Sequence, residues 1–163
     1  MKDDRGGTMW SRSSIPGAIL VAVVIAGCGG SSAPSLSAFK RGFVTDRAQF
    51  RSLGTDVGTT LQQAPTKTDT EIATGFGALA TRATQQAAQL RQLKAPAAYK
   101  PALDQLVAGF DAVASDLHMI SGAGTAHNVQ GAKTATATLI HDATKVKAAD
   151  TSLSAKLGLP KTG

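Results

Sequence analysis

Cys28 is the residue whose chemistry stands out in this 163-residue chain, because it is the only cysteine. A thiolate can act as a nucleophile or a metal ligand, whereas a disulfide within the chain would need a second cysteine. Ile25, Ala26 and Gly27 directly precede Cys28. A processing peptidase needs small residues just before its cut, and Ala26 and Gly27 supply them directly before Cys28.

The residues before this cysteine have the composition of a targeting segment. The run from Ile15 to Ala26 reads IPGAILVAVVIA, which is shorter than the stretch of about 20 apolar residues that spans a membrane. Basic residues precede the run, as they do in a secretory signal, and aspartates at positions 3 and 4 weaken that flank. A start at Met9 instead of Met1 would leave a cleaner flank, and the sequence leaves both starts open.

The stretch Ile25-Ala26-Gly27-Cys28 resembles the lipobox of bacterial lipoprotein precursors, which has an aliphatic residue, two small residues and a cysteine. Leu is its usual first residue, and Ile is a tolerated variant. The resemblance covers the first 28 residues and implies cleavage before Cys28, a diacylglyceryl thioether on its sulfur and often an acyl chain on its amine. Several acyl chains make a stable anchor, whereas one binds marginally.

This resemblance implies an extracytoplasmic protein, held at the outer face of a cell membrane or on the periplasmic side of an envelope. Two other interpretations stay open for the same residues. One is an ordinary secretory signal, and the other is a short buried helix in which Cys28 packs as a small apolar side chain. The Ala-, Thr- and Gly-rich composition resembles that of lipoproteins from high-GC actinobacteria.

The remaining chain divides into a tether and one domain. We predict a lipoprotein signal over residues 1–27, a Gly/Ser tether over 28–36, a helical domain over 37–159 and a tail over 160–163. A hydrophobic content of 42% and a charged content of 17% are typical of a globular chain. A flexible tether of this length would span roughly 15–18 Å, so the domain would lie close to the membrane.

Apolar residues recur at helical spacing in four segments after the tether. We expect helices from about Ser37 to Ala64, from Thr68-Asp69 to Leu93, from about Pro101 to Ile120, and from about Ala126 to Leu157. Long helices with short connections run antiparallel to their neighbours. The pattern therefore predicts an all-α fold, an antiparallel up-down-up-down four-helix bundle. Gly54 and Gly58 form a GxxxG pattern in the first segment, for which we expect close helix packing.

Charged residues interrupt two of the four apolar stripes. The first stripe is interrupted where Arg47 stands and the fourth where Asp150 stands, and an up-down bundle would place these positions at the same level. We therefore predict an ion pair between Arg47 and Asp150. Such a pair would fix helix register more than it adds stability. The alternative is that both side chains extend to solvent.

Metal binding has weak support in this sequence. His118, Met119 and His127 could gather at one end of the bundle as a loose copper site, but exposed histidines are the preferred interpretation. The paired His or Glu-x-x-His spacing of metal sites in helical bundles is absent, and the chain has one Glu in total. We therefore expect no cofactor and no metal.

These observations favour a non-enzymatic role. The sequence has no catalytic triad, paired glutamates or phosphate-binding loop. We expect a lipid-anchored binding or scaffolding module of the cell envelope, with the membrane as its first partner and another envelope protein as a candidate second partner. The alternative is a small-ligand or metal carrier that uses a cleft between helices. The net charge of +6 suits anionic partners, but scarce aromatic residues, at 4%, argue against nucleic acid.

Replacing Cys28 with Ala tests the lipid anchor directly. The Cys28→Ala chain should remain unprocessed or be released from the membrane fraction, because no thiol is left to carry the diacylglyceryl group. Cell fractionation and the intact mass of the mature protein measure both effects. Unchanged membrane attachment together with an unchanged mature mass would contradict the lipobox interpretation.

Overall fold

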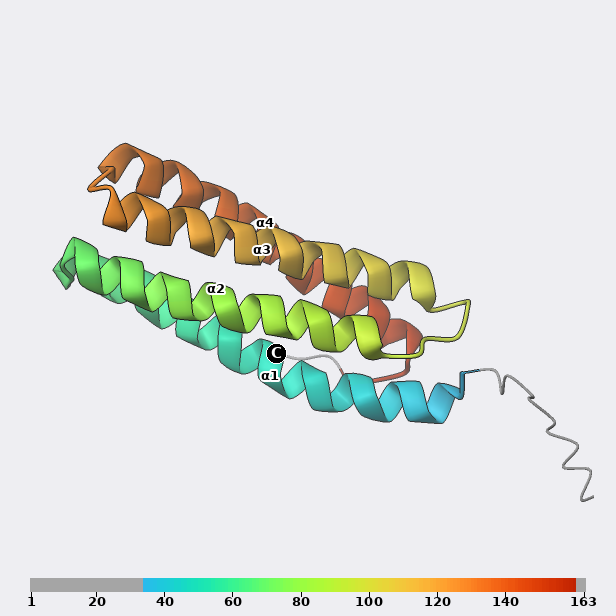
Figure 1. Ribbon diagram of the computed structural model, residues 1–163. Helices are drawn as coiled ribbons and strands as arrows, with labels where there is room; N and C mark the ends of the chain where they lie inside the picture. Colours follow the sequence, from blue (N-terminus) through green and yellow to red (C-terminus); the bar gives the residue numbers. More distant parts are fainter. Residues whose placement is uncertain (1–33, 161–163) are drawn as a thin grey trace, which may run out of the picture. The chain divides into compact units, whose positions relative to one another are not determined.

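The computed structural model describes residues 34–160, and all of its regular elements in this range are helical. The predicted fold class, an all-α four-helix bundle, is confirmed, and consecutive helices run in opposite directions (Figure 1). The signal segment 1–27 and most of the tether lie outside the described residues, as do residues 161–163. Within the described range, no helix combines the length and the apolar composition needed to cross a bilayer. The elements are α1 (Leu36–Gln63), η1 (Ala64–Thr66), α2 (Asp69–Gln92), α3 (Lys100–Thr125) and α4 (Val129–Lys156).

The start of α2 is fixed by a capping box between Thr68 and Glu71. The Thr68 hydroxyl accepts from the backbone N–H of Glu71 at 3.3 Å, and the Glu71 carboxylate accepts from the backbone N–H of Thr68 at 2.9 Å. Each bond satisfies an amide that the helix itself cannot pair. The bonds from the Thr68 backbone and hydroxyl, with nearby Lys67, lower the pKa of Glu71.

The fourth helix begins at Val129, slightly later than the approximate start that the sequence indicated. His127 adopts a left-handed backbone with φ of 52°, and the Asn128 N–H returns to the Ala123 carbonyl at 2.8 Å. This arrangement ends α3, because a left-handed residue cannot continue the helix. The Asn128 side chain then caps α4 by accepting from the Gly131 N–H at 2.9 Å.

The core is a line of aromatic rings flanked by aliphatic side chains. The rings of Phe39, Phe43 and Phe50 follow one another along α1, and Phe50 meets Phe110 of α3 with ring centroids 4.8 Å apart. Most of the predicted apolar stripes are buried. The exposed positions are Ala143 in the middle of α4 and the first residues of two helices, Leu36 and Val129, which are 46% and 64% exposed.

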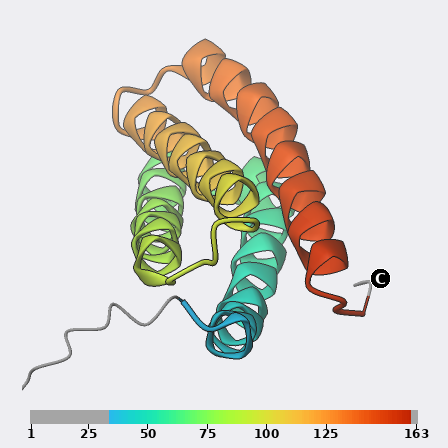
Figure 2. The same ribbon diagram turned by 90° about the vertical axis from the view of Figure 1, so that its right-hand side faces the viewer.

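The four helices do not pack equally against one another. α2 lies against α3, and α3 against α4, over much of their length, whereas α1 approaches α2 over a shorter stretch and has few close backbone approaches to α4. Figure 1 shows the α3–α4 pair above the α1–α2 pair. Figure 2 shows the same bundle toward its end, with α2 and α3 on one side and α1 and α4 on the other.

Glycine residues allow helices to approach each other closely, but not at the two positions of the GxxxG pattern. A Cβ atom at Gly109 would lie 2.8 Å from Val146 Cγ2, and one at Gly124 would lie 3.0 Å from the Asp69 carbonyl oxygen. Nothing lies within 4 Å of such an atom at Gly54 or Gly58, so the expected close packing there is wrong. The bare backbone at Gly109 brings α4 close to α3.

The substitutions Gly109→Ala and Gly54→Ala should therefore change stability in opposite directions. At position 109 the added methyl group would clash with the stiff Val146 side chain, and this cost outweighs the gain in helix propensity. We therefore expect the free energy of unfolding of Gly109→Ala to fall by roughly 1 kcal/mol. At position 54 the same added methyl meets no atom, and the free energy of unfolding should rise by about 0.5–1 kcal/mol. Urea unfolding measures both changes, and shifts of the same sign would contradict the assignment.

Candidate functional site

A groove opens between α1 and α4, where the two helices do not close on each other. It has a volume of about 380 Å³, within the range of roughly 300–1,000 Å³ found for small-molecule sites. Side chains of α3 form its floor together with those that α1 and α4 turn inward. The apolar lining consists of Phe50, Leu53, Val57, Phe110, Val113, Leu139 and Val146.

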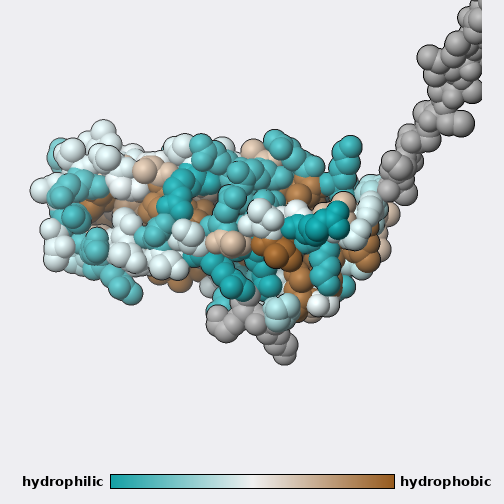
Figure 3. All heavy atoms as spheres, turned by 90° about the horizontal axis from the view of Figure 1, so that it is seen from below, coloured by the Kyte–Doolittle hydropathy of each residue, from teal (hydrophilic) through white to brown (hydrophobic). Residues whose placement is uncertain are grey.

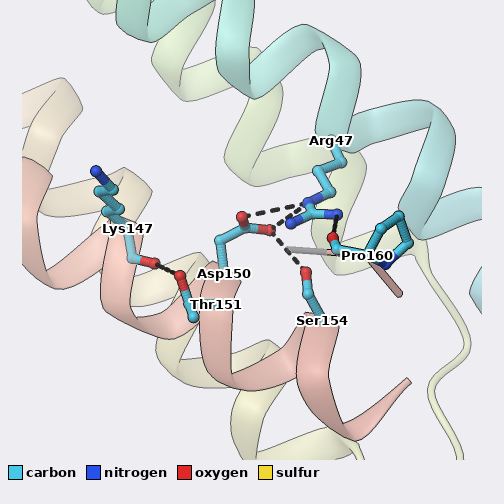
Figure 4. A network of polar contacts seen from close by, with 6 residues as sticks. All are labelled: Arg47, Lys147, Asp150, Thr151, Ser154 and Pro160. Carbon is cyan, nitrogen blue, oxygen red and sulfur yellow. Dashed lines mark hydrogen bonds and ion pairs between the residues drawn. The ribbon is translucent and has the colours of Figure 1, made fainter. Parts of the chain in front are cut away.

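An ion pair between α1 and α4 lies in the wall of this groove. Arg47 Nε donates to both carboxylate oxygens of Asp150, at 3.1 and 3.2 Å, and Arg47 Nη1 donates to the Pro160 carbonyl at 3.2 Å. The Ser154 hydroxyl donates to Asp150 at 3.3 Å (Figure 4). The side chains of Arg47 and Asp150 are only 8% and 16% exposed. The structure thus brings together the two residues that the sequence paired.

Two further cations, Arg51 of α1 and Lys147 of α4, lie on the groove walls. Both residues are exposed. Unlike Arg47, neither side chain makes a hydrogen bond or ion pair with another described residue. Their charge is therefore available to a ligand, whereas that of Arg47 is balanced by Asp150.

The residues considered for a metal site do not form one. His118 and Met119 are exposed on α3, and His127 lies in the turn before α4. His127 Nδ1 lies 2.6 Å from an oxygen of Asp69, which ties this turn to the start of α2. Among residues 34–160, no group of three His, Cys, Asp or Glu side chains is placed to hold a metal ion.

Two buried carboxylates were not predicted as core residues. Asp116 is 2% exposed and Asp46 is 9% exposed, and each has a carboxylate oxygen without a hydrogen-bond partner in the described part of the chain. Burial raises the pKa of both groups, and the charge of Asp142 raises the pKa of Asp116 further. The available signal was helical spacing, because Asp116 follows the buried Val113 by three positions and precedes the buried Ile120 by four.

The outward faces of the bundle are mostly polar. In Figure 3, polar side chains cover much of the visible face, and apolar side chains show between them, chiefly toward the end where α1 begins. The large apolar side chains that are exposed come from α1, α3 and α4, so they do not belong to one helix face: they are Leu36, Val44, Met119, Val129 and Ile140.

Comparison with known proteins gives no match. No protein-family model fits the chain, and neither the curated proteins nor the solved structures contain a significant match. The chemistry of the groove therefore carries the functional argument.

The Arg47–Asp150 pair is suited to a double-mutant cycle. Arg47→Met should lower the free energy of unfolding by roughly 2 kcal/mol, because it leaves a largely buried carboxylate without its charged partner. Adding Asp150→Leu should recover much of that loss, since a well-packed apolar pair can replace a buried ion pair. Denaturant unfolding of the two single variants and the double variant gives the coupling. Strictly additive losses would contradict an energetic link between the two side chains.

Asp116→Asn should stabilise the protein at neutral pH. Because the folded state raises the pKa of Asp116, the native carboxyl holds its proton more tightly than the unfolded one. Stability is then lost as pH rises through the folded pKa. Removing the charge should raise the free energy of unfolding by on the order of 1 kcal/mol at pH 7, and this gain should become smaller toward pH 4. Melting curves at both pH values measure it, and a gain that grows on acidification would contradict this assignment.

Proposed function

We propose that this chain is a lipid-anchored, extracytoplasmic helical bundle that binds a small ligand at the cell envelope without catalysing a reaction. The lipobox-like stretch that ends at Cys28 supports the anchor. The groove between α1 and α4 supports the proposal of ligand binding, and it is the observation on which that proposal rests. Its charged side chains are two accessible cations and an ion pair, which suit holding a ligand rather than group transfer.

The same groove favours a small-ligand carrier over the other forms of binding considered. A scaffold that works through its surface would be supported by one contiguous apolar patch, whereas the exposed large apolar residues come from three helices. A copper carrier would be supported by gathered metal ligands. The groove has the volume and the apolar lining that small-molecule sites share.

Native mass spectrometry of the whole protein, purified from its own host, tests this proposal. The native mass should exceed the denatured mass by that of a small organic molecule, which is lost when the bundle unfolds. The same preparation of Ala143→Leu, which narrows the groove from the α4 wall, should carry less of that molecule. A matched Ala137→Leu variant, on the same helix but outside the groove lining, should retain it.

Equal native and denatured masses for the wild-type protein would contradict ligand carriage. In that case the scaffold becomes the better proposal, and crosslinking in the intact envelope would look for its partners. A mass difference equal to one metal ion would favour the copper-type carrier instead.

A further inference from the structure

The charged side chains of the groove between α1 and α4 all lie toward one of its ends. Because the two helices are antiparallel, Arg47 stands across from Asp150, and the lining residues follow in opposite order along the two walls. Arg51 and Lys147 come one turn further along. The far end of the groove is apolar, with Val57 on α1 and Leu139 on α4. A ligand that fits this order has a polar head and an apolar body.

The charged end carries a surplus of positive charge. Asp150 is the one carboxylate in the lining, and Arg47 donates to both of its oxygens. Arg51 and Lys147, one from each wall, have no acidic partner among the described residues. Two cations beside an apolar surface attract an anion, and the low-dielectric wall strengthens that attraction.

Small residues keep the middle of the groove open. Gly54 lies on the α1 wall and Ala143 on the α4 wall, and a Cβ atom built at position 54 would meet nothing within 4 Å. The resulting space of about 380 Å³ is that of a small-molecule site. A peptide helix, about 10–12 Å across, is a much larger occupant.

We propose that this groove binds a single-chain amphiphile with an anionic head group, of which a long-chain carboxylate is the simplest form. The head lies between Arg51 and Lys147, and the apolar chain lies over Phe50, Val113 and Leu139. This assignment rests on the proposed ligand-binding function and names the chemical class of the ligand.

Three probes with the same twelve-carbon chain and different heads test the assignment on the purified full chain. They are dodecanoate, dodecanol and dodecyltrimethylammonium, used below their aggregation concentrations in titration calorimetry. Dodecanoate should bind about fivefold more tightly than dodecanol, as two solvent-accessible charge contacts would give. The cationic probe should bind most weakly, because the groove walls repel it.

Pairs of variants distinguish the contribution of the charged end of the groove from that of its apolar end. Arg51→Gln combined with Lys147→Gln should lower the affinity for dodecanoate about fivefold and leave the affinity for dodecanol unchanged. The matched control, Arg41→Gln with Lys133→Gln, changes the net charge equally on the same two helices outside the groove lining, and it should alter the affinity for neither probe.

A second pair of variants tests the apolar part of the groove. Gly54→Leu should lower the affinity for both probes at least tenfold, because its side chain fills the groove. Gly58→Leu, at a position equally unobstructed but outside the lining, should leave both affinities unchanged. Circular dichroism checks that each variant folds.

The outcomes separate this inference from the proposed function. Equal affinity for dodecanoate and dodecanol, unaffected by the Arg51/Lys147 double variant, would overturn the anionic head group while leaving a ligand-binding groove. If none of the three probes binds, but the native mass still shows a small molecule, the inference of an amphiphilic ligand is wrong and the proposed carrier function stands. If no probe binds and the native mass shows no small molecule, both the inference and the proposed function are wrong.

Discussion

The close approach of α4 to α3 at Gly109 decides how the remaining helices can be arranged. With no side chain at that position, Val146 packs almost against the α3 backbone. α3 is also held to α2 at Gly124, where the two backbones nearly touch. α2, α3 and α4 therefore form a layered unit with α3 in the middle. A helix drawn tightly to one neighbour is less able to close against the other, so α4 leaves space on its α1 side.

α1 is held on this unit by its buried aromatic face and by ion pairs on either side of that face. Its aromatic residues reach the core, where Phe50 meets Phe110, and Asp56 pairs with Arg82 of α2. On its other side the interaction with α4 is largely polar, through Arg47 and Asp150. A directional pair of this kind specifies one register between two helices, whereas an apolar seam would tolerate sliding. The space between α1 and α4 is thus kept at a defined width and depth.

The sequence predicts the elements of this fold well because their signals are local. Thr68 with Glu71 marks the start of α2, and the regular spacing around Phe110 marks the buried face of α3. The Arg47–Asp150 pair could also be predicted, since each residue interrupts an apolar stripe. What periodicity does not contain is the distance between two helices. It shows that a position faces inward, but not whether a neighbour fills the space there.

The groove and the roles of the glycines are therefore visible only in the structure. Gly54 and Gly58 have the spacing of a packing motif, yet Gly54 lines open space and Gly109, outside any such pattern, makes the tight contact. The turn before α4 is a local feature, in which His127 takes the left-handed backbone conformation that His adopts more often than most non-glycine residues. Asp116 was missed because a carboxylate beside a core residue is usually exposed.

The bond from Arg47 to the Pro160 carbonyl has a consequence for the order in which this protein is built. The two residues are 113 positions apart, and Asp150 is 103 positions from Arg47. A chain synthesised from its first residue onward has α1 available long before these partners emerge. The layered unit of α2, α3 and α4 can assemble through contacts that are nearer in sequence, whereas the final seating of α1 waits for the end of synthesis. Until then α1 lacks its polar contacts with α4 and the residues that follow it.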